Sequence, residues 1–338
     1  MECNPPERMT PPPPNRMQQP SRMVERRVEI GGIVTSYAEG PANGAPLVLL
    51  HGQGSQWEDY TKVLPTLTQR HHVYAIDVHG HGQSARLGPG GYTNRHIGEL
   101  IAGFIDAVVG EPVILSGHSS GALLALWIAA HRPDMVSGLF LEDPPLYSSI
   151  PPRAERTIGG ILPRLAAEFL RDDPTGGFQR LYVEKSGYFS FFGPLAAPLV
   201  RYSLRWIDHH PGEPLRIFFL PSLINVYFEG LANYDPAFGA AWDDGTWYGG
   251  FDTDAALAAV KCPTTLLHTN WWFTRYGTYY NADGTLMAAM DGDDAARATK
   301  LLGDVEAVTL SSGHLVHFER PKEYLAAVGD LSQRVRSR

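Results

Sequence analysis

Residues 113–128 read VILSGHSSGALLALWI, an apolar run that ends in a glycine–serine turn and continues as an Ala- and Leu-rich stretch. The run predicts a buried strand, and the stretch after it predicts a helix. The turn between them, at 117–121, has the pattern Gly-x-Ser-x-Gly. Between a strand and a helix, this pattern holds the serine on a sharp, strained turn with its Oγ exposed above the sheet. Ser119 is therefore the candidate nucleophile.

The surroundings of Ser119 suit a reaction in which negative charge develops. Gly117 and Gly121 leave room for the strand and the helix to approach each other closely. The helix N-terminus adds positive potential, and the backbone N–H of Ser120 is expected to point at the developing oxyanion. The Ser120 side chain lacks flanking glycines at the required offsets, so we do not expect it to be the nucleophile.

Short apolar runs recur from residue 24 onward. VERRVEI and IVTSYAE flank Gly31-Gly32 and predict a hairpin. Further strands are predicted at 46–50, 71–77, 112–118, 138–142, 264–268 and 306–310. Helices are predicted at 58–69, 94–109, 120–131, 254–260, 293–302 and 321–334. This alternation predicts an α/β fold with a mostly parallel central sheet and helices on both faces.

Residues 148–251 interrupt the alternation and are rich in Pro, Gly and aromatic residues. We expect an inserted, mainly helical cap over the carboxyl edge of the sheet, where open α/β sheets bind ligands. Residues 23–147 and 252–338 would form the core. The aromatic residues either fill the cap's own core, which is the favoured reading for any single one, or line a ligand cavity. Residues 1–22, with PPPPNRMQQPSR, predict a disordered or oligomer-contact arm.

A serine hydroxyl needs a general base to act as a nucleophile. His314, in TLSSGHLVHFERP, follows the last predicted strand and precedes the last predicted helix. That position lies at the same edge of the sheet as Ser119, so His314 is the candidate base. His317 is expected to face the helix. The pair does not predict a metal site, because no carboxylate or third histidine that could complete one is apparent.

The order strand–HGQG–DVHGHGQS–GHSSG–cap–SGHLVHFERP resembles the α/β-hydrolase superfamily over nearly all of residues 24–336. The resemblance implies an α/β-hydrolase fold and the chain order nucleophile, acid, histidine. It also implies that the backbone N–H of Gln53 is the second oxyanion donor. His51 is expected to be structural, and the histidines of DVHGHGQS are expected to be structural or pocket-lining.

The acid is missing from its usual place. Most members of that superfamily carry it in a loop of the form H-G-x-x-D after the strand that corresponds to TTLLH. Here the chain reads HTNWW at 268–272. Asn270 could orient an imidazole, but it is neutral and cannot stabilise an imidazolium. Carboxylates further along, Asp283, Asp291 and Asp293, would need an unusual excursion of the chain.

Some members of the superfamily place the acid after the earlier strand, which here reads GLFLEDPPLY. Glu142 and Asp143 compete for the role. Side chains alternate faces along a strand, so the two cannot both point at the histidine. Pro144 and Pro145 break the strand directly after Asp143 and place it at the mouth of the loop. We choose Asp143, with Glu142 as the alternative.

Residues 274–290, TRYGTYYNADGTLMAAM, predict a β-hairpin around Asn281-Ala282-Asp283-Gly284. The hairpin replaces the usual acid loop. A free hairpin with aromatic and apolar faces would be marginally stable alone. We therefore expect it to pack on another subunit, which would make the protein a homo-oligomer, either a dimer or a tetramer.

Four features together resemble the bacterial zearalenone lactonases of the ZenA type: GHSSGALLALW, LEDPPLY, ANYDPAFGAAW and the hairpin. The resemblance implies a Ser-His-Asp triad with its acid on the earlier strand, an oligomer, and opening of a macrocyclic resorcylic lactone. The segment HGQG at 51–54 departs from it, being closer to an ordinary oxyanion loop than the version in those lactonases.

The expected reaction is acyl transfer through an acyl-enzyme, because serine as nucleophile disfavours epoxide hydrolase and haloalkane dehalogenase chemistry. The aromatic cap favours a bulky apolar or aromatic ester or lactone. Expected substrate contacts are Gly52, Pro144, Tyr147 and Trp271. A broad carboxylesterase, a C–C bond hydrolase of the same fold and a non-catalytic ligand-binding receptor remain alternatives.

The composition of the chain limits the classes of binding partner that we expect. The formal charge of −8 and the lack of an apparent Lys/Arg cluster predict no nucleic-acid binding. Cys3 and Cys262 have no disulfide or metal spacing, and no cofactor is predicted. No apolar run approaches the roughly 18–20 residues of a membrane span, and no secretory segment is apparent. We expect a cytoplasmic protein without a membrane partner.

Overall fold

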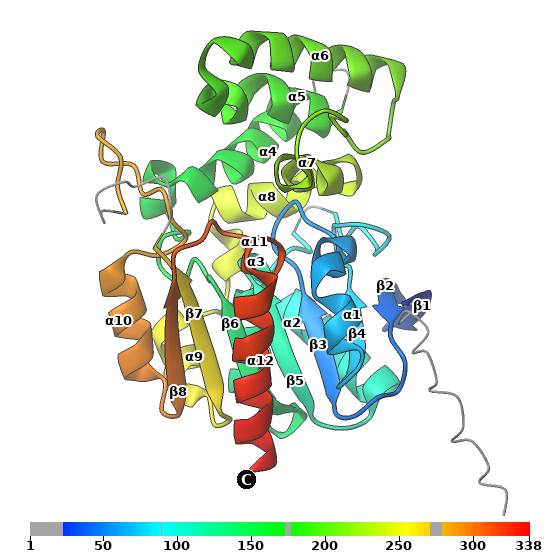
Figure 1. Ribbon diagram of the computed structural model, residues 1–338, viewed down its shortest axis with the longest axis vertical. Coiled ribbons are helices and arrows are strands. Elements are labelled where there is room, and N and C mark those ends of the chain that lie inside the picture. Colours follow the sequence, from blue (N-terminus) through cyan, green and yellow to red (C-terminus); the bar gives the residue numbers. More distant parts are fainter. Residues whose placement is uncertain (1–22, 89, 173–176, 271–278) are drawn as a thin grey trace, which may run out of the picture.

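The structure is a computed structural model that describes residues 23–88, 90–172, 177–270 and 279–338 (Figure 1). In these residues one sheet has the strand order β1-β2-β4-β3-β5-β6-β7-β8. The strands are β1 Val24–Ile30, β2 Ile33–Glu39, β3 Pro46–Leu50, β4 His72–Ile76, β5 Val113–His118, β6 Val136–Glu142, β7 Thr264–Thr269 and β8 Val305–Leu310. β2 pairs antiparallel with β1 and β4, and the other pairs are parallel. The predicted mostly parallel sheet is confirmed.

Helices cover both faces of this sheet, as the two hydrophobic cores show. Leu47 and Leu49 of β3 face the core that contains α1 Leu64–Leu67 and α12 Pro321–Arg336. Val48 and Leu50 face the opposite core, with α2 Asn94–Phe104, α3 Ser120–His131, α9 Thr253–Ala259 and α10 Gly292–Leu301. Successive side chains of a strand point to opposite faces. A continuous apolar run such as PLVLL therefore fits a strand buried on both sides.

Two of the predicted helices are divided. The stretch predicted at 58–69 forms a 3-10 helix, η1 Trp57–Lys62, followed by α1. The stretch predicted at 94–109 forms α2 and a π-helical turn, η2 Ile105–Val109, which ends at Gly110 with φ 71°. A left-handed residue at this position commonly terminates a helix, and glycine adopts it without steric cost.

The segment between β6 and β7 is mainly helical and lies over the carboxyl ends of the strands (Figure 1). Its helices are α4 Ile161–Asp172, α5 Phe178–Lys185, α6 Ala196–His209, α7 Ser222–Glu229 and α8 Pro236–Asp243. Many of its aromatic side chains are buried, among them Phe189, Phe228, Phe238 and Trp247, each at most 2% exposed. Phe189 and Phe228 stack on each other, with ring centroids 5.2 Å apart. Phe189 and Phe228 thus pack within the segment, whereas Phe238 also contacts His81 and Tyr92, which lie outside it.

The predicted hairpin at 274–290 lies partly outside the described residues, which resume at Tyr279. Its turn is present, with Asn281 accepting the N–H of Gly284 and a single antiparallel bridge between Tyr280 and Leu286. Leu286 also forms a parallel bridge with Thr157, at the start of the helical segment of the same chain. The apolar residues Leu286 and Met290 are at most 1% exposed. The described part of the hairpin thus buries apolar side chains within its own chain.

Candidate functional site

The nucleophile elbow forms where β5 meets α3. Ser119 has φ 53° and ψ −119°, and only it and Asp143 have positive φ among the non-glycine residues that the structure describes. A backbone conformation of this kind is costly for an L-residue and is typical of functional turns. The N–H of Ser119 donates to the carbonyl of Glu142 at 2.9 Å. A side chain at Gly117 or Gly121 would overlap neighbouring backbone, which explains why both positions are glycine.

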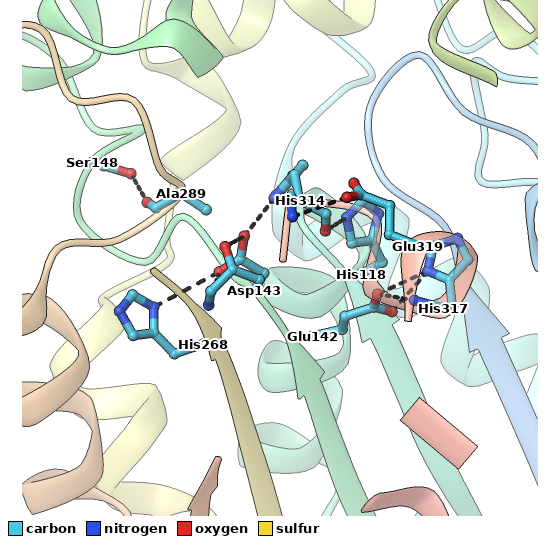
Figure 2. A network of polar contacts seen from close by, with 11 residues as sticks. His118, Glu142, Asp143, Ser148, His268, Ala289, His314, His317 and Glu319 are labelled. Atoms are coloured by element: carbon cyan, nitrogen blue, oxygen red, sulfur yellow. Dashed lines mark hydrogen bonds and ion pairs between the residues drawn. The ribbon is translucent and has the colours of Figure 1, made fainter. Parts of the chain in front are cut away.

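Asp143 and His314 meet at the carboxyl edge of the sheet (Figure 2). His314 Nδ1 lies 2.7 Å from Asp143 Oδ2. The carboxylate also accepts the backbone N–H of Thr269 at 3.0 Å and the hydroxyl of Thr269 at 2.9 Å. On its other side, His268 Nδ1 is 3.8 Å from Oδ1, a distance longer than a hydrogen bond. The carboxylate is fully buried and fully engaged.

Glu142 turns to the opposite face of the sheet, as strand alternation predicts. Its Oε1 accepts the backbone N–H of His317 at 2.9 Å, and His317 Nδ1 lies 2.9 Å from both carboxylate oxygens. Neither residue is accessible to solvent. Two adjacent carboxylates thus each have their own histidine, and it is Asp143 that contacts His314.

The charges around the Asp143–His314 pair favour its ionised form. Burial opposes the ionisation of Asp143, but the imidazoles of His268 and His314 outweigh that effect and lower its pKa to about 2. Burial likewise disfavours the imidazolium of His314. The Asp143 carboxylate opposes this effect, with smaller contributions from Glu142 and Glu319, and the pKa of His314 is raised above its ordinary value.

This raised pKa predicts the pH dependence of the reaction. His314 can accept a proton from Ser119 only when its Nε2 is unprotonated, and a raised pKa keeps it protonated to higher pH. We expect kcat/KM to fall on the acid side with a midpoint above the ordinary value of 6.5. The measurement is kcat/KM for a neutral ester across pH 5 to 9. A midpoint well below 6.5 would contradict this assignment.

The loop that carries His314 is held from several sides (Figure 2). His118 Nε2 donates to the carbonyl of His314 at 3.0 Å. Burial lowers the pKa of His118 well below its ordinary value, so it remains neutral. Glu319 accepts the N–H of Gly313 at 3.0 Å, and the His317–Glu142 contact fixes the following turn. The position of His314 is therefore fixed by hydrogen bonds to its own backbone carbonyl and to the backbone of Gly313 and His317.

The loop after β3 lies against the elbow. A Cβ on Gly52 would come within 2.9 Å of Ser119 Cβ, so this position needs glycine. Among the described residues, the N–H of Gln53 takes part in no backbone hydrogen bond of a loop or turn. The Gln53 side chain donates to the hydroxyl of Tyr234, on the helical segment, at 2.7 Å.

The histidines near this loop make structural contacts. His51 Nε2 accepts the N–H of Val78 at 3.0 Å, which leaves its Nδ1 to donate to the Gly52 carbonyl at 2.8 Å. Burial lowers the pKa of His51 to about 4. His81 Nε2 accepts the N–H of Gly54 at 3.0 Å. His51 thus uses both ring nitrogens to hold the loop, whereas His81 uses only Nε2, and its buried Nδ1 has no hydrogen-bond partner among the described residues.

Comparison with known proteins agrees with this architecture. Residues 45–201 match a family model described as the alpha/beta hydrolase fold. The solved enol-lactonase from Burkholderia xenovorans has a TM-score of 0.60 to this chain at 14% identity, over 91% of this chain and 100% of that one. The chain has the α/β-hydrolase fold.

Two curated relatives resemble parts of this chain. The (E)-2-((N-methylformamido)methylene)succinate hydrolase of Acinetobacter baylyi is 31% identical over 114 residues, which are 34% of this chain and 43% of that protein. The 2-hydroxymuconate semialdehyde hydrolase of a Pseudomonas species is 32% identical over 126 residues, 36% of this chain and 44% of that protein. In both cases the match spans less than half of the relative's length.

The residues predicted to contact the substrate lie in different parts of the structure. Gly52 is at the elbow, and Pro144 is buried next to Asp143. The hydroxyl of Tyr147 donates to Asp254 at 2.7 Å, and Arg297 lies 4.6 Å from the centre of its ring. Tyr147 is thus engaged with α9 and α10. Trp271 lies outside the described residues.

Sequence reasoning missed the residues that surround the acid. Thr269 and His268 contact Asp143, but the sequence placed His268 only at the end of a predicted strand and Thr269 only in the loop after it, which has no carboxylate. No group of three or more His, Cys, Asp or Glu residues that could hold a metal ion occurs in the described ranges. Among the described residues, no helix is long and apolar enough to cross a membrane.

Proposed function

We propose that this α/β-hydrolase is a serine hydrolase that cleaves a bulky apolar or aromatic ester or lactone through an acyl-enzyme. The observation that carries the proposal is the 2.7 Å contact between His314 Nδ1 and Asp143 Oδ2, at the edge of the sheet where Ser119 occupies its strained turn. A nucleophile, a base and a carboxylate that orients the base make up the triad of acyl-transfer enzymes.

In the proposed mechanism, the proton on His314 Nδ1 is held by Asp143, which leaves Nε2 free to act as a base. Ser119 Oγ attacks the substrate carbonyl while Nε2 takes its proton. The N–H groups of Gln53 and Ser120 stabilise the oxyanion. The C–O bond of the substrate then breaks as His314 protonates the leaving alkoxide; the alcohol of an ester departs, whereas the hydroxyl of an opened lactone stays attached to the acyl group. Water, activated by the same imidazole, releases the acid and restores Ser119.

The specific substrate that we propose is zearalenone, with residues 148–251 as a cap over the site. Support comes from the motifs GHSSGALLALW, LEDPPLY and ANYDPAFGAAW, which resemble the bacterial zearalenone lactonases. The buried aromatics of the cap segment add less support than their number suggests, because many of them pack on one another. The similarity in fold to an enol-lactonase is compatible with a lactone substrate.

Kinetics on a substrate panel tests this specificity. We expect kcat/KM for zearalenone to exceed that for p-nitrophenyl acetate and butyrate by at least about tenfold, because apolar burial of a large substrate adds binding energy at about 25 cal/mol per Å². Faster turnover of the short esters would favour a broad carboxylesterase. Ligand-dependent thermal stabilisation without turnover would favour a receptor.

A C–C bond hydrolase is the second candidate, because one of the curated relatives is a 2-hydroxymuconate semialdehyde hydrolase. Such an enzyme could use the same Ser119, His314 and Asp143. Incubation with 2-hydroxymuconate semialdehyde, followed by its absorbance, separates the two candidates. If the protein turned over this compound and did not turn over zearalenone, it would be a C–C bond hydrolase.

We also propose that the protein is a homo-oligomer in which residues 274–290 contribute to the contact. The support for this proposal is the tip of the hairpin, where residues 280–283 are exposed although Leu286 and Met290 are buried within their own chain. Size-exclusion chromatography of the full chain and of a variant with the tip at 281–284 shortened would test this. We expect the shortened variant to elute as a smaller species, and an unchanged elution volume would refute the idea.

A further inference from the structure

We propose that Thr269, at the end of β7, is a positioning residue that fixes the Asp143 carboxylate for His314. The proposal rests on the proposed function, because it assigns Thr269 a part in the action of that triad. Thr269 does not touch the reacting atoms. It would act through Asp143, which lies on the neighbouring strand's end 126 residues earlier in the chain.

Three hydrogen bonds tie Asp143 to β7. β6 and β7 pair in parallel up to Glu142 and Leu267. One residue further on, the N–H of Asp143 donates to the carbonyl of Leu267 at 2.8 Å. The N–H of Thr269 donates to Oδ1 at 3.0 Å, and its hydroxyl donates to Oδ2 at 2.9 Å. The end of β7 therefore holds both the main chain and the side chain of the acid.

These bonds matter because Asp143 is both strained and buried. Its φ of 43° is unfavourable for an L-residue, so the surrounding contacts must maintain it. Its carboxylate has no exposed surface, so each oxygen needs a donor. Among the described residues, only His314 and Thr269 hydrogen-bond to the side chain of Asp143, because His268 remains at 3.8 Å.

The geometry makes the hydroxyl more than a source of stability. Oδ2 accepts from both the Thr269 hydroxyl and His314 Nδ1, so the two donors together set the plane of the carboxylate. Without the hydroxyl, the carboxylate could rotate about its Cβ–Cγ bond while remaining ionised. That rotation would lengthen the contact with His314 and loosen the orientation of the imidazole, to which catalysis is sensitive.

Thr265 provides a matched control on the same strand. It lies four residues before Thr269, on the same side of β7, and it is equally buried. Its hydroxyl has no hydrogen-bond partner among the described residues. Replacing threonine with valine at either site removes one buried hydroxyl at nearly constant shape, but only Thr269→Val removes a donor to the acid.

The test compares Thr269→Val, Thr269→Ala, Thr269→Ser and Thr265→Val in the full chain. The readouts are kcat and KM for p-nitrophenyl butyrate and the low-field proton resonance of His314 Nδ1–H. We expect Thr269→Val and Thr269→Ala to lower kcat about 10- to 100-fold, the range for loss of one hydrogen bond to a charged group, with KM nearly unchanged. The resonance should shift upfield or broaden. Thr269→Ser should restore both readouts, and Thr265→Val should resemble the wild type.

Wild-type kcat and resonance in both Thr269→Val and Thr269→Ala would overturn the proposal, as would an equal loss in Thr265→Val. Asp143→Asn separates this failure from failure of the proposed function. If Asp143→Asn abolishes activity and the resonance while the Thr269 variants remain normal, only the role of Thr269 is wrong. If Asp143→Asn remains active, the proposed function itself fails.

Discussion

Replacing Ser119 with alanine is expected to reduce kcat about 10⁴- to 10⁶-fold, the range seen when the nucleophile of a serine triad is removed. Ser119 alone occupies the strained turn between β5 and α3, and no other hydroxyl can form the acyl-enzyme from that position. The measurement is kcat on p-nitrophenyl butyrate and on zearalenone. KM or ligand affinity should change little, because the oxyanion donors and the rest of the site remain.

Ser116→Ala is the matched control for this change. Ser116 is a buried serine of the same strand, and its hydroxyl lies 2.9 Å from the hydroxyl of Tyr324 on α12. Its loss should lower the free energy of unfolding by about 1 kcal/mol while kcat remains within about threefold of wild type. If Ser119→Ala kept more than about a tenth of wild-type kcat, Ser119 would not be the nucleophile.

The second large effect is expected for Asp143→Asn, which should lower kcat about 10⁴-fold, as the corresponding change does in the serine-protease triad. The side-chain amide of the variant is neutral. Its NH2 group would also face the donors of Thr269 and His314, which in the wild type bond to carboxylate oxygens. His314 would then lose both its preferred tautomer and the charge that stabilises its imidazolium. The low pKa of Asp143, about 2, shows how strongly its surroundings favour the anion.

Glu142→Gln is the control for Asp143→Asn, because it also replaces a carboxylate with an amide, at the neighbouring residue. Glu142 hydrogen-bonds to His317 and makes no hydrogen bond with His314 among the described residues. We expect a loss of stability of about 1–3 kcal/mol, as for a weakened buried hydrogen bond to a charged group, and a decrease in kcat of less than about tenfold. Thermal unfolding and kcat should be measured on both variants. A dead Glu142→Gln variant beside an active Asp143→Asn variant would reverse the assignment of the acid.

Much of the sheet and the elbow could be predicted because their causes are local in sequence. VILSGHSSGALLALWI contains the strand, the glycines that permit close approach and the helix. Strand alternation predicted that Glu142 and Asp143 would not share one histidine, and the prolines after Asp143 decided the choice between them; in the structure the two carboxylates contact different histidines. Short-range rules were sufficient for both.

The residues that support the acid could not be predicted in this way. The contact between Thr269 and Asp143 depends on the pairing of β6 with β7, which are separated in the sequence by the whole helical segment. The hairpin was expected to need a partner subunit, but Leu286 and Met290 bury themselves against their own chain. Apolar patterning shows that a side chain will be covered, and it does not show by which surface.

Fluorophosphonate labelling followed by intact-mass measurement and peptide mapping tests the central claim most directly. The reagent reports an activated serine whatever the natural substrate is. The account predicts one adduct per chain, located on Ser119, and labelling that becomes at least about 100-fold slower in His314→Ala and Asp143→Asn. An adduct on another residue, or labelling of Ser119 at the wild-type rate in both variants, would contradict it.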